Sequence, residues 1–222
     1  MKNNLIILIL LLLVLSLPLL GGVGGGPVNY LDLTTAILGL MYIVLEWRVS
    51  AWMWVVGIVM QLLGIVLYYQ KGLYADCGME FYYLAMSAYG LWKWKSPKQG
   101  GETSSPTRIK SFFESATECR RGLYGLLVFV ALWALIYFLL VTFTNSTVPL
   151  ADSFTTALSI IGIWALAHKY LEQWFIWIAV DIVTSILYFY KDIPFKASLY
   201  ALYVLIAVFG FVSWRRKYLK QV

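Results

Sequence analysis

The sequence predicts an all-α membrane protein built from two parallel three-helix repeats. Each repeat is a triple-helix bundle, one linker helix joins them in a 3+1+3 arrangement, and an extra hydrophobic helix precedes them. The first reason is composition: 61% of the 222 residues are hydrophobic and 13% are charged, whereas a soluble domain is about half apolar and about a quarter charged. The second reason is a series of long apolar runs. The third is an internal repeat at a constant offset of 120 residues.

Eight apolar runs are expected to form helices. A bilayer-spanning helix needs about 20 mostly apolar residues, and several runs are shorter and interrupted by polar residues, which suits helices around a polar cavity. The ten tryptophans and sixteen tyrosines fit aromatic belts at the membrane interfaces. The runs cover residues 5–20, 31–47, 51–70, 79–94, 123–143, 154–168, 172–190 and 197–214.

The N-terminal hydrophobic segment, residues 1–26, has two interpretations. Its charged start (MKNN) and apolar middle match a secretory signal peptide, but they equally match a retained extra helix. The glycines of GGVGGGP (21–27) lack the Lys-Ser/Thr that completes a phosphate-binding loop, so we interpret them as a flexible turn.

The distribution of basic residues predicts the orientation. With the N-terminus inside and eight helices, 14 of the 17 Lys and Arg residues fall in inner segments, and only Lys71, Lys191 and Lys196 fall in outer loops. This asymmetry places the C-terminus in the cytoplasm, and removal of the first helix would not change the direction. Because the basic residues occupy short loops between apolar runs, the net charge of +6 does not indicate nucleic-acid binding.

Internal boundaries follow from composition. Residues 96–122 are rich in Gly, Ser, Pro and charge (SPKQGGETSSPTRIK), so we expect a cytoplasmic linker between two halves. An amphipathic interfacial helix is an alternative for IKSFFESATECRR (109–121). The expected organisation is a first repeat at 31–95, the linker at 96–122, the linker helix at 123–143, a second repeat at 152–216 and a cytoplasmic tail at 217–222.

The internal repeat becomes visible when the sequence is shifted by 120 residues. The matches need no gap between Asp32 and Arg215, and they join Trp54 to Trp174, Lys71 to Lys191, Tyr83 to Tyr203, Gly90 to Gly210 and Trp94 to Trp214. Two adjacent three-helix units would point in opposite directions, and the linker helix at 123–143 restores the same direction. Parallel repeats of this kind are a known transporter design, with substrate bound near the midplane at the repeat interface.

Polar residues inside the apolar runs mark a candidate substrate site. The offset matches Gln61 to Asp181, each near the middle of the second helix of its repeat. Trp174, Trp177 and Asp181 are spaced i, i+3 and i+7 and therefore share one helical face, which Tyr188 continues.

A second acid, Glu80, lies near the outer end of its helix, with Tyr83 and Ser87 within two turns. An ionisable group at membrane depth costs about 2.5–3.5 kcal/mol on insertion scales, and its default interpretation is functional. Few intramembrane cations are available to pair with Asp181 or Glu80. Because indole rings and a carboxylate together attract a flat organic cation, we predict such a substrate.

Each candidate also has a structural interpretation. Trp174 starts its helix and could anchor it at the interface, whereas Trp177 lies deeper and favours a cavity. Asp181 could be protonated and join two helices by a hydrogen bond. Gln61 could likewise form a hydrogen bond between helices. Glu80 could be a solvated residue of an outer vestibule.

These residues resemble the PnuC-type vitamin transporter family. The W-x-x-W-x-x-x-N/D signature is formed here by Trp174, Trp177 and Asp181, HKYLEQW (168–174) precedes it, and FYYLAMSAYGLWKW (81–94) resembles the family's third core helix. The resemblance covers residues 31–216. It implies the architecture of SWEET sugar carriers, a homotrimer, and uptake of nicotinamide riboside across the bacterial inner membrane. It also implies facilitated diffusion by alternating access, and trapping through phosphorylation by a cytoplasmic kinase.

The resemblance carries over Trp174, Trp177, Asp181 and Gln61 as substrate contacts. Two positions depart from it, because many nicotinamide riboside members have Asn at Asp181 and often Gln at Glu80. The stretch GLYADCGMEFYYL (72–84) is nearer to thiamine-type relatives. We therefore predict nicotinamide riboside as the substrate, with thiamine as the alternative.

Other classes of function find less support. An integral membrane enzyme would need a nucleophile, a metal or an acid–base pair, and His168 with Glu172 is the only candidate. No CxxC or HExxH spacing occurs, so no metal site or cofactor is expected. Cys77 and Cys119 fall on opposite sides of the membrane, which predicts no disulfide. A proton-coupled carrier, with Asp181 or Glu80 titrating, is a further alternative.

Overall fold

The computed structural model describes residues 30–70, 74–96, 108–144, 146–190 and 194–221. The predicted first helix (5–20), Lys71 and Lys191 lie outside these residues. The described residues form seven helices: α2 (Tyr30–Trp47), α3 (Trp52–Gln70), α4 (Tyr74–Lys95), α5 (Ala116–Phe143), α6 (Pro149–Ala167), α7 (Gln173–Tyr190) and α8 (Pro194–Leu219). Apart from one isolated bridge between Lys110 and Tyr170, this part of the chain contains no β-structure. The prediction of an all-α protein is confirmed.

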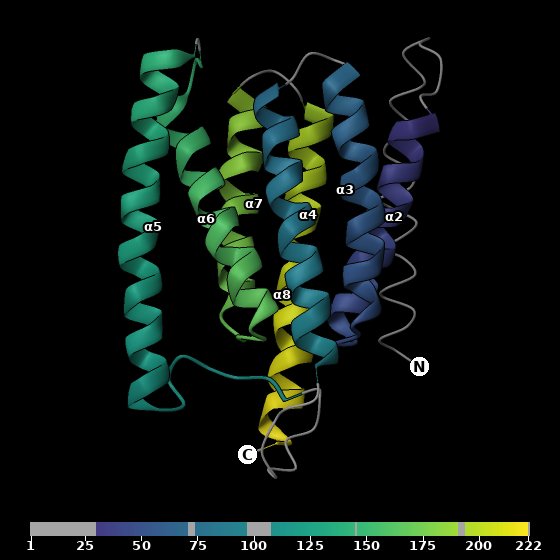
Figure 1. The fold of residues 1–222 in the computed structure, drawn as a ribbon, viewed down its shortest axis with the longest axis vertical. Coiled ribbons are helices and arrows are strands. Elements are labelled where there is room, and N and C mark those ends of the chain that lie inside the picture. Colours follow the sequence, from purple (N-terminus) through teal and green to yellow (C-terminus); the bar gives the residue numbers. More distant parts are fainter. Residues whose placement is uncertain (1–29, 71–73, 97–107, 145, 191–193, 222) are drawn as a thin grey trace. The chain divides into compact units, whose positions relative to one another are not determined.

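The chain divides into two compact units, Met1–Thr107 and Arg108–Val222. In the first unit α3 packs against α2 and α4, and in the second α7 packs against α6 and α8, while α5 packs against α6 (Figure 1). Within the described residues, four helices are long and apolar enough to span a bilayer: Ala116–Phe143, Pro149–Ala167, Gln173–Tyr190 and Leu199–Leu219. Two shorter apolar stretches, Ile37–Trp47 and Trp52–Leu67, lie in α2 and α3.

Glycines set the close packing of α3 on α4. The Trp54 ring lies against Gly90, where a Cβ atom would come within 2.5 Å of the indole. Trp54 also meets Trp94 edge to face, with ring centroids 5.6 Å apart at 88°. The second unit repeats this arrangement between α7 and α8: Trp174 lies against Gly210 and meets Trp214 at 5.8 Å and 82°.

Two more local features recur at the same offset of 120 residues. Val49, in the turn before α3, and Lys169, in the turn before α7, are the residues other than glycine with positive φ in the described backbone, at 57° and 61°. The Cys77 thiol of α4 donates to the Ile65 carbonyl of α3. At the equivalent place in the second unit, Ser185 of α7 donates to the Ala197 carbonyl of α8. The offset found in the sequence therefore relates equivalent helix contacts within each unit.

Helix α5 begins at Ala116, seven residues before the expected start at 123. Ser115 is its N-cap and accepts a hydrogen bond from the Glu118 N–H at 3.2 Å, a Ser-x-x-Glu capping pattern that fixes the start. Residues 108–115 are therefore not helical, and the alternative of an amphipathic helix from 109 is wrong for this part. Ile109 in this segment is instead buried by tertiary contacts, at 1% exposed, whereas Phe113 is exposed.

We call residues 108–115 the strap, because they run across the turn between α6 and α7. The Lys110 N–H donates to the Lys169 carbonyl at 2.9 Å, and the Leu171 N–H donates to the Lys110 carbonyl at 2.8 Å. Phe112 stacks on Tyr170 with ring centroids 4.0 Å apart. The second part of the predicted linker is thus an ordered cover over the α6–α7 turn.

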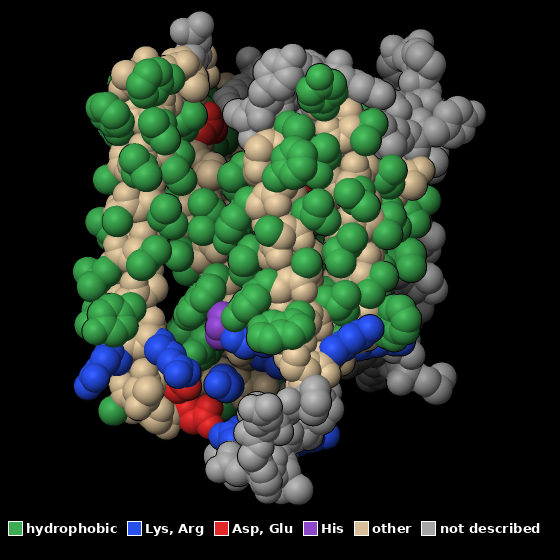
Figure 2. All heavy atoms as spheres, viewed as in Figure 1, with side chains coloured by type: hydrophobic (Ala, Val, Ile, Leu, Met, Phe, Trp, Pro, Cys, Tyr) green, Lys and Arg blue, Asp and Glu red, His purple; other side chains and the backbone are tan. Residues whose placement is uncertain are grey.

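Helix α5 has no buried residue along its 28 residues. Hydrophobic side chains cover its length in Figure 2, and basic side chains gather at the end where Arg120 and Arg121 lie. A helix that is apolar over most of its surface suits lipid or another subunit rather than water.

Candidate functional site

The first unit places polar predicted residues along the α3–α4 interface. Trp54 lies opposite Gly90, Gly57 opposite Ser87 and Gly64 opposite Glu80. This antiparallel register puts Gln61, which is 7% exposed, at the level of Tyr83. Gln61, Glu80, Tyr83 and Ser87 therefore come together within one helix pair.

Ser87 is the most buried of these side chains, at 1% exposed. Its hydroxyl has no hydrogen-bond partner among the described residues, and a Cβ added to Gly57 would lie 3.1 Å from it. The Tyr42 ring of α2 borders the same glycine, with Cε2 3.2 Å from that Cβ position. A buried hydroxyl without a partner is costly, so this group is a candidate for contact with a ligand.

Glu80 directs its carboxyl group onto the backbone of α3. A Cβ at Gly64 would lie 2.8 Å from the carboxyl carbon and 3.0 Å from both carboxyl oxygens. Glycine at position 64 therefore makes room for the acid. The side chain is half-buried, and the interpretation as a vestibule residue remains a prediction.

In the second unit, Trp174 is a packing residue between α7 and α8. It is 3% exposed and lies between Gly210 and the edge of Trp214. Its indole N–H has no hydrogen-bond partner in the described part of the chain, and the same is true of Trp54. A contact between Trp174 and a substrate would require this packing to open.

Trp177 contacts a different neighbour. Its ring covers Gly162 of α6, with Cε2 and Cζ2 3.3 Å from a Cβ position there. The predicted common face of α7 is therefore divided, with Trp174 packed on α8 and Trp177 packed on α6. Trp177 is half-buried, so it is more accessible than Trp174.

Asp181 lies between α7 and α8 and is 8% exposed. It is within electrostatic reach of Tyr203 on α8. Among the residues that the structure describes, no ion pair includes Asp181. Toward the far end of α7, Tyr188 stacks on Tyr200 with ring centroids 5.4 Å apart at 22°. A carboxyl group is thus buried in the interior of this unit without a cationic partner in the described residues.

Comparison with known proteins identifies the family. The family model described as nicotinamide mononucleotide transporter matches residues 29–216. The chain belongs to this family. It is 26% identical over 185 residues to the riboflavin/roseoflavin transporter RibM of Streptomyces davaonensis, covering 82% of this chain and 83% of that protein. It is 23% identical to the nicotinamide riboside transporter PnuC of Neisseria mucosa, covering 86% of this chain and 73% of that one.

Two further similar proteins agree with this family assignment. The Escherichia coli nicotinamide riboside transporter PnuC is 20% identical over 210 residues, covering 87% of this chain and 88% of that one. The crystal structure of the vitamin B3 transporter PnuC matches the fold with a TM-score of 0.73 and 21% identity, covering 98% of this chain and 93% of that chain. The predicted resemblance to PnuC-type transporters is confirmed, and so is the interpretation that this member of the nicotinamide mononucleotide transporter family is not an enzyme.

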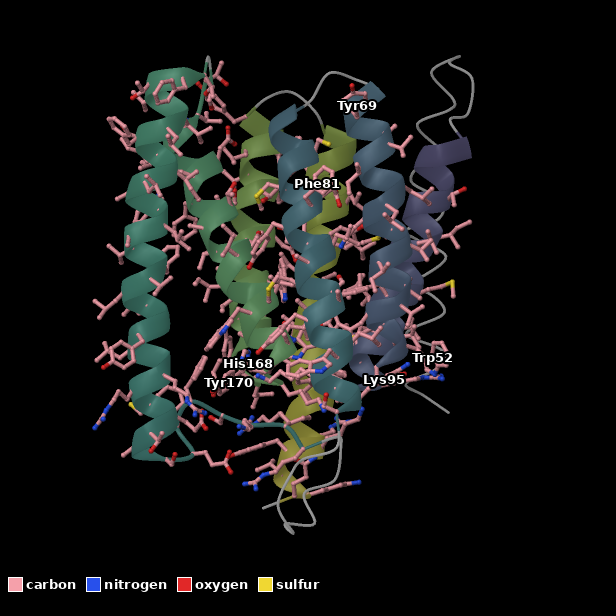
Figure 3. All side chains as sticks on the ribbon, viewed as in Figure 1. Trp52, Tyr69, Phe81, Lys95, His168 and Tyr170 are labelled. Carbon is pink, nitrogen blue, oxygen red and sulfur yellow. The ribbon has the colours of Figure 1, made fainter. Side chains whose placement is uncertain are left out.

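Within this family member, His168 and Glu172 have structural roles. The His168 ring donates to the Trp164 carbonyl at 2.8 Å and lies beside Tyr170 in the α6–α7 turn (Figure 3). Glu172 accepts hydrogen bonds from the Ser111 hydroxyl and the Phe112 N–H of the strap. The described residues contain no cluster of His, Cys, Asp and Glu suited to a metal ion.

Sequence reasoning did not single out Tyr42, Gly57, Gly64 or Gly162. These residues decide where rings and carboxyl groups fit, but they carry no charge and form no motif. A signal was available in the shifted alignment, where Gly57 meets Trp177 and Tyr42 meets Gly162.

Proposed function

We propose that this protein takes up a flat, positively charged vitamin, with nicotinamide riboside as the substrate, across the bacterial inner membrane. The observation that carries the proposal is Asp181, a buried carboxyl group with no ion-pair partner among the described residues. A buried charge is stable only when it is paired, and a cationic substrate supplies the missing charge. The half-buried ring of Trp177, one turn before it, offers a π-face to the same cation.

The proposed mechanism treats α2–α4 and α6–α8 as the two parallel repeats of a 3+1+3, SWEET-like transporter, with α5 as the linker helix. Matched contacts at the 120-residue offset support this assignment. Substrate would bind near the midplane, and one bundle would rock against the other to alternate access. Transport would be facilitated diffusion, and a cytoplasmic kinase would trap the product by phosphorylation.

The proposed assembly is a homotrimer, with the C-terminus in the cytoplasm. The exposed apolar surface of α5 supports a contact with lipid or other subunits. The positive-inside rule supports the orientation, because basic residues lie in the last turn of α4, near the start of α5 and in the last turn of α8.

Two other substrates are favoured by specific observations. The acids at Asp181 and Glu80 favour thiamine, since both positions depart from those of many nicotinamide riboside members. The 26% identity to RibM favours riboflavin. Riboflavin carries no positive charge at neutral pH, so it would not use the Asp181 charge.

A parallel titration tests the substrate. Purified protein is titrated with nicotinamide riboside, thiamine and riboflavin, and binding is followed by tryptophan fluorescence. We expect the two cations to bind and nicotinamide riboside to bind more tightly. Uptake into proteoliposomes with and without a pH gradient then tests coupling, since an unchanged rate without the gradient excludes obligatory proton coupling. Absence of uptake of all three vitamins would reject the proposal.

The Asp181→Ala variant tests the counter-ion directly. We expect it to weaken cation binding more than tenfold, a loss of about 1.4 kcal/mol or more, while the protein still inserts. Asp152→Ala is the matched control, because Asp152 lies at the start of α6 and accepts a hydrogen bond from Ser146. Full affinity in Asp181→Ala would show that the carboxyl group is not a counter-ion.

A further inference from the structure

The two units fill one equivalent interhelical slot with an aromatic ring, but they supply the ring from opposite helices. In the first unit the Tyr42 ring of α2 covers Gly57 of α3, with Cε2 3.2 Å from the glycine's Cβ position. In the second unit the Trp177 ring of α7 covers Gly162 of α6 at 3.3 Å. The offset of 120 residues relates Tyr42 to Gly162 and Gly57 to Trp177. The aromatic residue and the glycine have therefore exchanged helices.

This exchange follows from space. A Cβ at either glycine would approach the facing ring more closely than ordinary van der Waals contact allows. At this level of each unit, a ring on one helix is packed closely on the other, so a glycine facing the ring is favoured. Both units therefore have a slot filled by a ring, but the helix that carries the ring differs between them.

Residues that the units share form the scaffold, as Trp54 and Trp174 show by their equivalent contacts. Residues that differ between the units are candidates to distinguish the parts of an asymmetric ligand. The differing residues lie near one another in each unit: Tyr42, Gly57, Gln61 and Ser87 in the first, and Gly162, Trp177, Asp181 and Ala207 in the second.

We propose that Tyr42 is a further substrate-contacting and specificity-determining residue, presented by the first unit as the counterpart of Trp177. The inference rests on the proposed function, in which Trp177 contacts the substrate, and it extends that role to the ring that fills the equivalent slot of the first unit. The Ser87 hydroxyl, buried and without a partner among the described residues, borders the same glycine. The slot of the first unit thus offers an aromatic face beside a hydrogen-bonding group, which suits the hydroxyl-bearing part of a vitamin.

Calorimetric titration with nicotinamide riboside and thiamine tests the proposal, because calorimetry does not depend on the tryptophans. We expect Tyr42→Ala and Trp177→Ala each to weaken binding about tenfold, and Tyr42→Phe, which keeps the ring, to weaken it less than threefold. Tyr69→Ala is the control, because Tyr69 is 67% exposed on α3 and lies at the opposite end of that helix from Trp52 (Figure 3). If Tyr42→Ala fails to fold, Tyr42→Leu removes the ring while filling its space.

The outcomes separate the two proposals. Weak binding in Trp177→Ala with full affinity in the folded Tyr42 variant, Tyr42→Ala or otherwise Tyr42→Leu, overturns the role of Tyr42 and leaves the proposed function standing. Absence of binding of either vitamin to the wild-type protein overturns the proposed function itself.

A stability measurement then tests the exchanged ring independently of any ligand. Gly57→Trp should lower the melting temperature, and adding Tyr42→Gly should restore it. A double variant no more stable than Gly57→Trp alone overturns the equivalence of Tyr42 and Trp177.

Discussion

Single glycines decide how the tryptophans of this protein pack. Gly90 and Gly210 let the flat indole rings of Trp54 and Trp174 lie directly on a helix backbone. Small residues at helix interfaces allow this close approach in membrane proteins, where packing rather than the hydrophobic effect holds helices together. Gly90 and Gly210 therefore matter because they have no side chain. Any side chain at either position must displace a tryptophan ring.

The Gly210→Ala variant should lower the stability of the second unit. Its Cβ would lie 2.3 Å from the Trp174 ring, and overpacking of this kind costs about 1–3 kcal/mol. Thermal unfolding in detergent, followed by circular dichroism, should show a reduced melting temperature. Gly125→Ala in α5 is the matched control, since its Cβ would meet nothing within 4 Å. An equal or higher melting temperature for Gly210→Ala would contradict the packing role of Trp174.

The spacing of residues in the sequence predicted which polar residues are buried, but not which helices pack against them. Helical periodicity and the 120-residue offset correctly grouped Gln61 and Asp181 as buried positions. The i, i+3, i+7 spacing fixed a face of α7, yet it carried no information about which helix covers each part of that face. Trp174 packs on α8 and Trp177 on α6 because Gly210 and Gly162 leave room there, and this complementarity involves residues far apart in the chain.

At the scale of elements, the strap shows how a polar linker becomes ordered. Glu118, in the first turn of α5, receives a hydrogen bond from the Tyr170 hydroxyl and pairs with Lys110 and Arg121. Glu172 binds the strap from the other side. The composition of residues 96–122 correctly indicated a break between halves, but the Ser115–Glu118 capping pattern was overlooked within a charged, Ser-rich stretch.

The hydrogen bond between Tyr170 and Glu118 predicts a pH dependence of stability. Burial, followed by this bond, raises the pKa of Tyr170 to about 12, above its ordinary value near 10. A raised pKa in the folded state stabilises the fold fully below about pH 10, and this contribution is lost as pH rises from about 10 through 12. The advantage of the wild-type protein over Tyr170→Phe should therefore be constant from pH 7 to 9 and shrink above pH 10.

Melting temperatures of the two proteins across this pH range provide the measurement. Comparison with Tyr170→Phe cancels the titration of the other tyrosines and of the lysines. Ser115→Ala is a useful second variant, because it removes the N-cap of α5, costs about 1 kcal/mol and should not change with pH. A difference between wild type and Tyr170→Phe that grows above pH 10 would contradict the assigned bond.

For the whole molecule, hydropathy and charge determined the fold class, because lipid-facing helices must be apolar along their length. The observed helices α2, α3 and α7 lie within one residue of the predicted ones. Helices α4, α6 and α8 begin three to five residues earlier than expected, at Tyr74, Pro149 and Pro194, since polar residues in their first turns weakened the apolar signal. The arrangement of the repeats and the substrate could not be derived in this way, because they depend on matched surfaces and on a few site residues.

Membrane orientation gives the last prediction, and helix α5 is suited to test it. Its 28 residues span about 42 Å at 1.5 Å per residue, which exceeds the roughly 30 Å hydrocarbon core. A helix of this length that crosses the bilayer places its two ends on opposite sides of the membrane. Cys119 is exposed near the first end, and Thr147 is exposed just beyond the second, so one helix carries a natural probe and a site for its control.

A membrane-impermeant maleimide should label Cys119 in inside-out vesicles but not in right-side-out vesicles. Cys77 adds little background because it is 6% exposed. The Cys119→Ser, Thr147→Cys double variant should give the opposite pattern. Cys119 is expected on the cytoplasmic side because basic residues cluster at the start of α5, and the positive-inside rule keeps such clusters in the cytoplasm. Reversed labelling would reject the orientation, and labelling of both sites from one side would show that α5 does not cross the membrane.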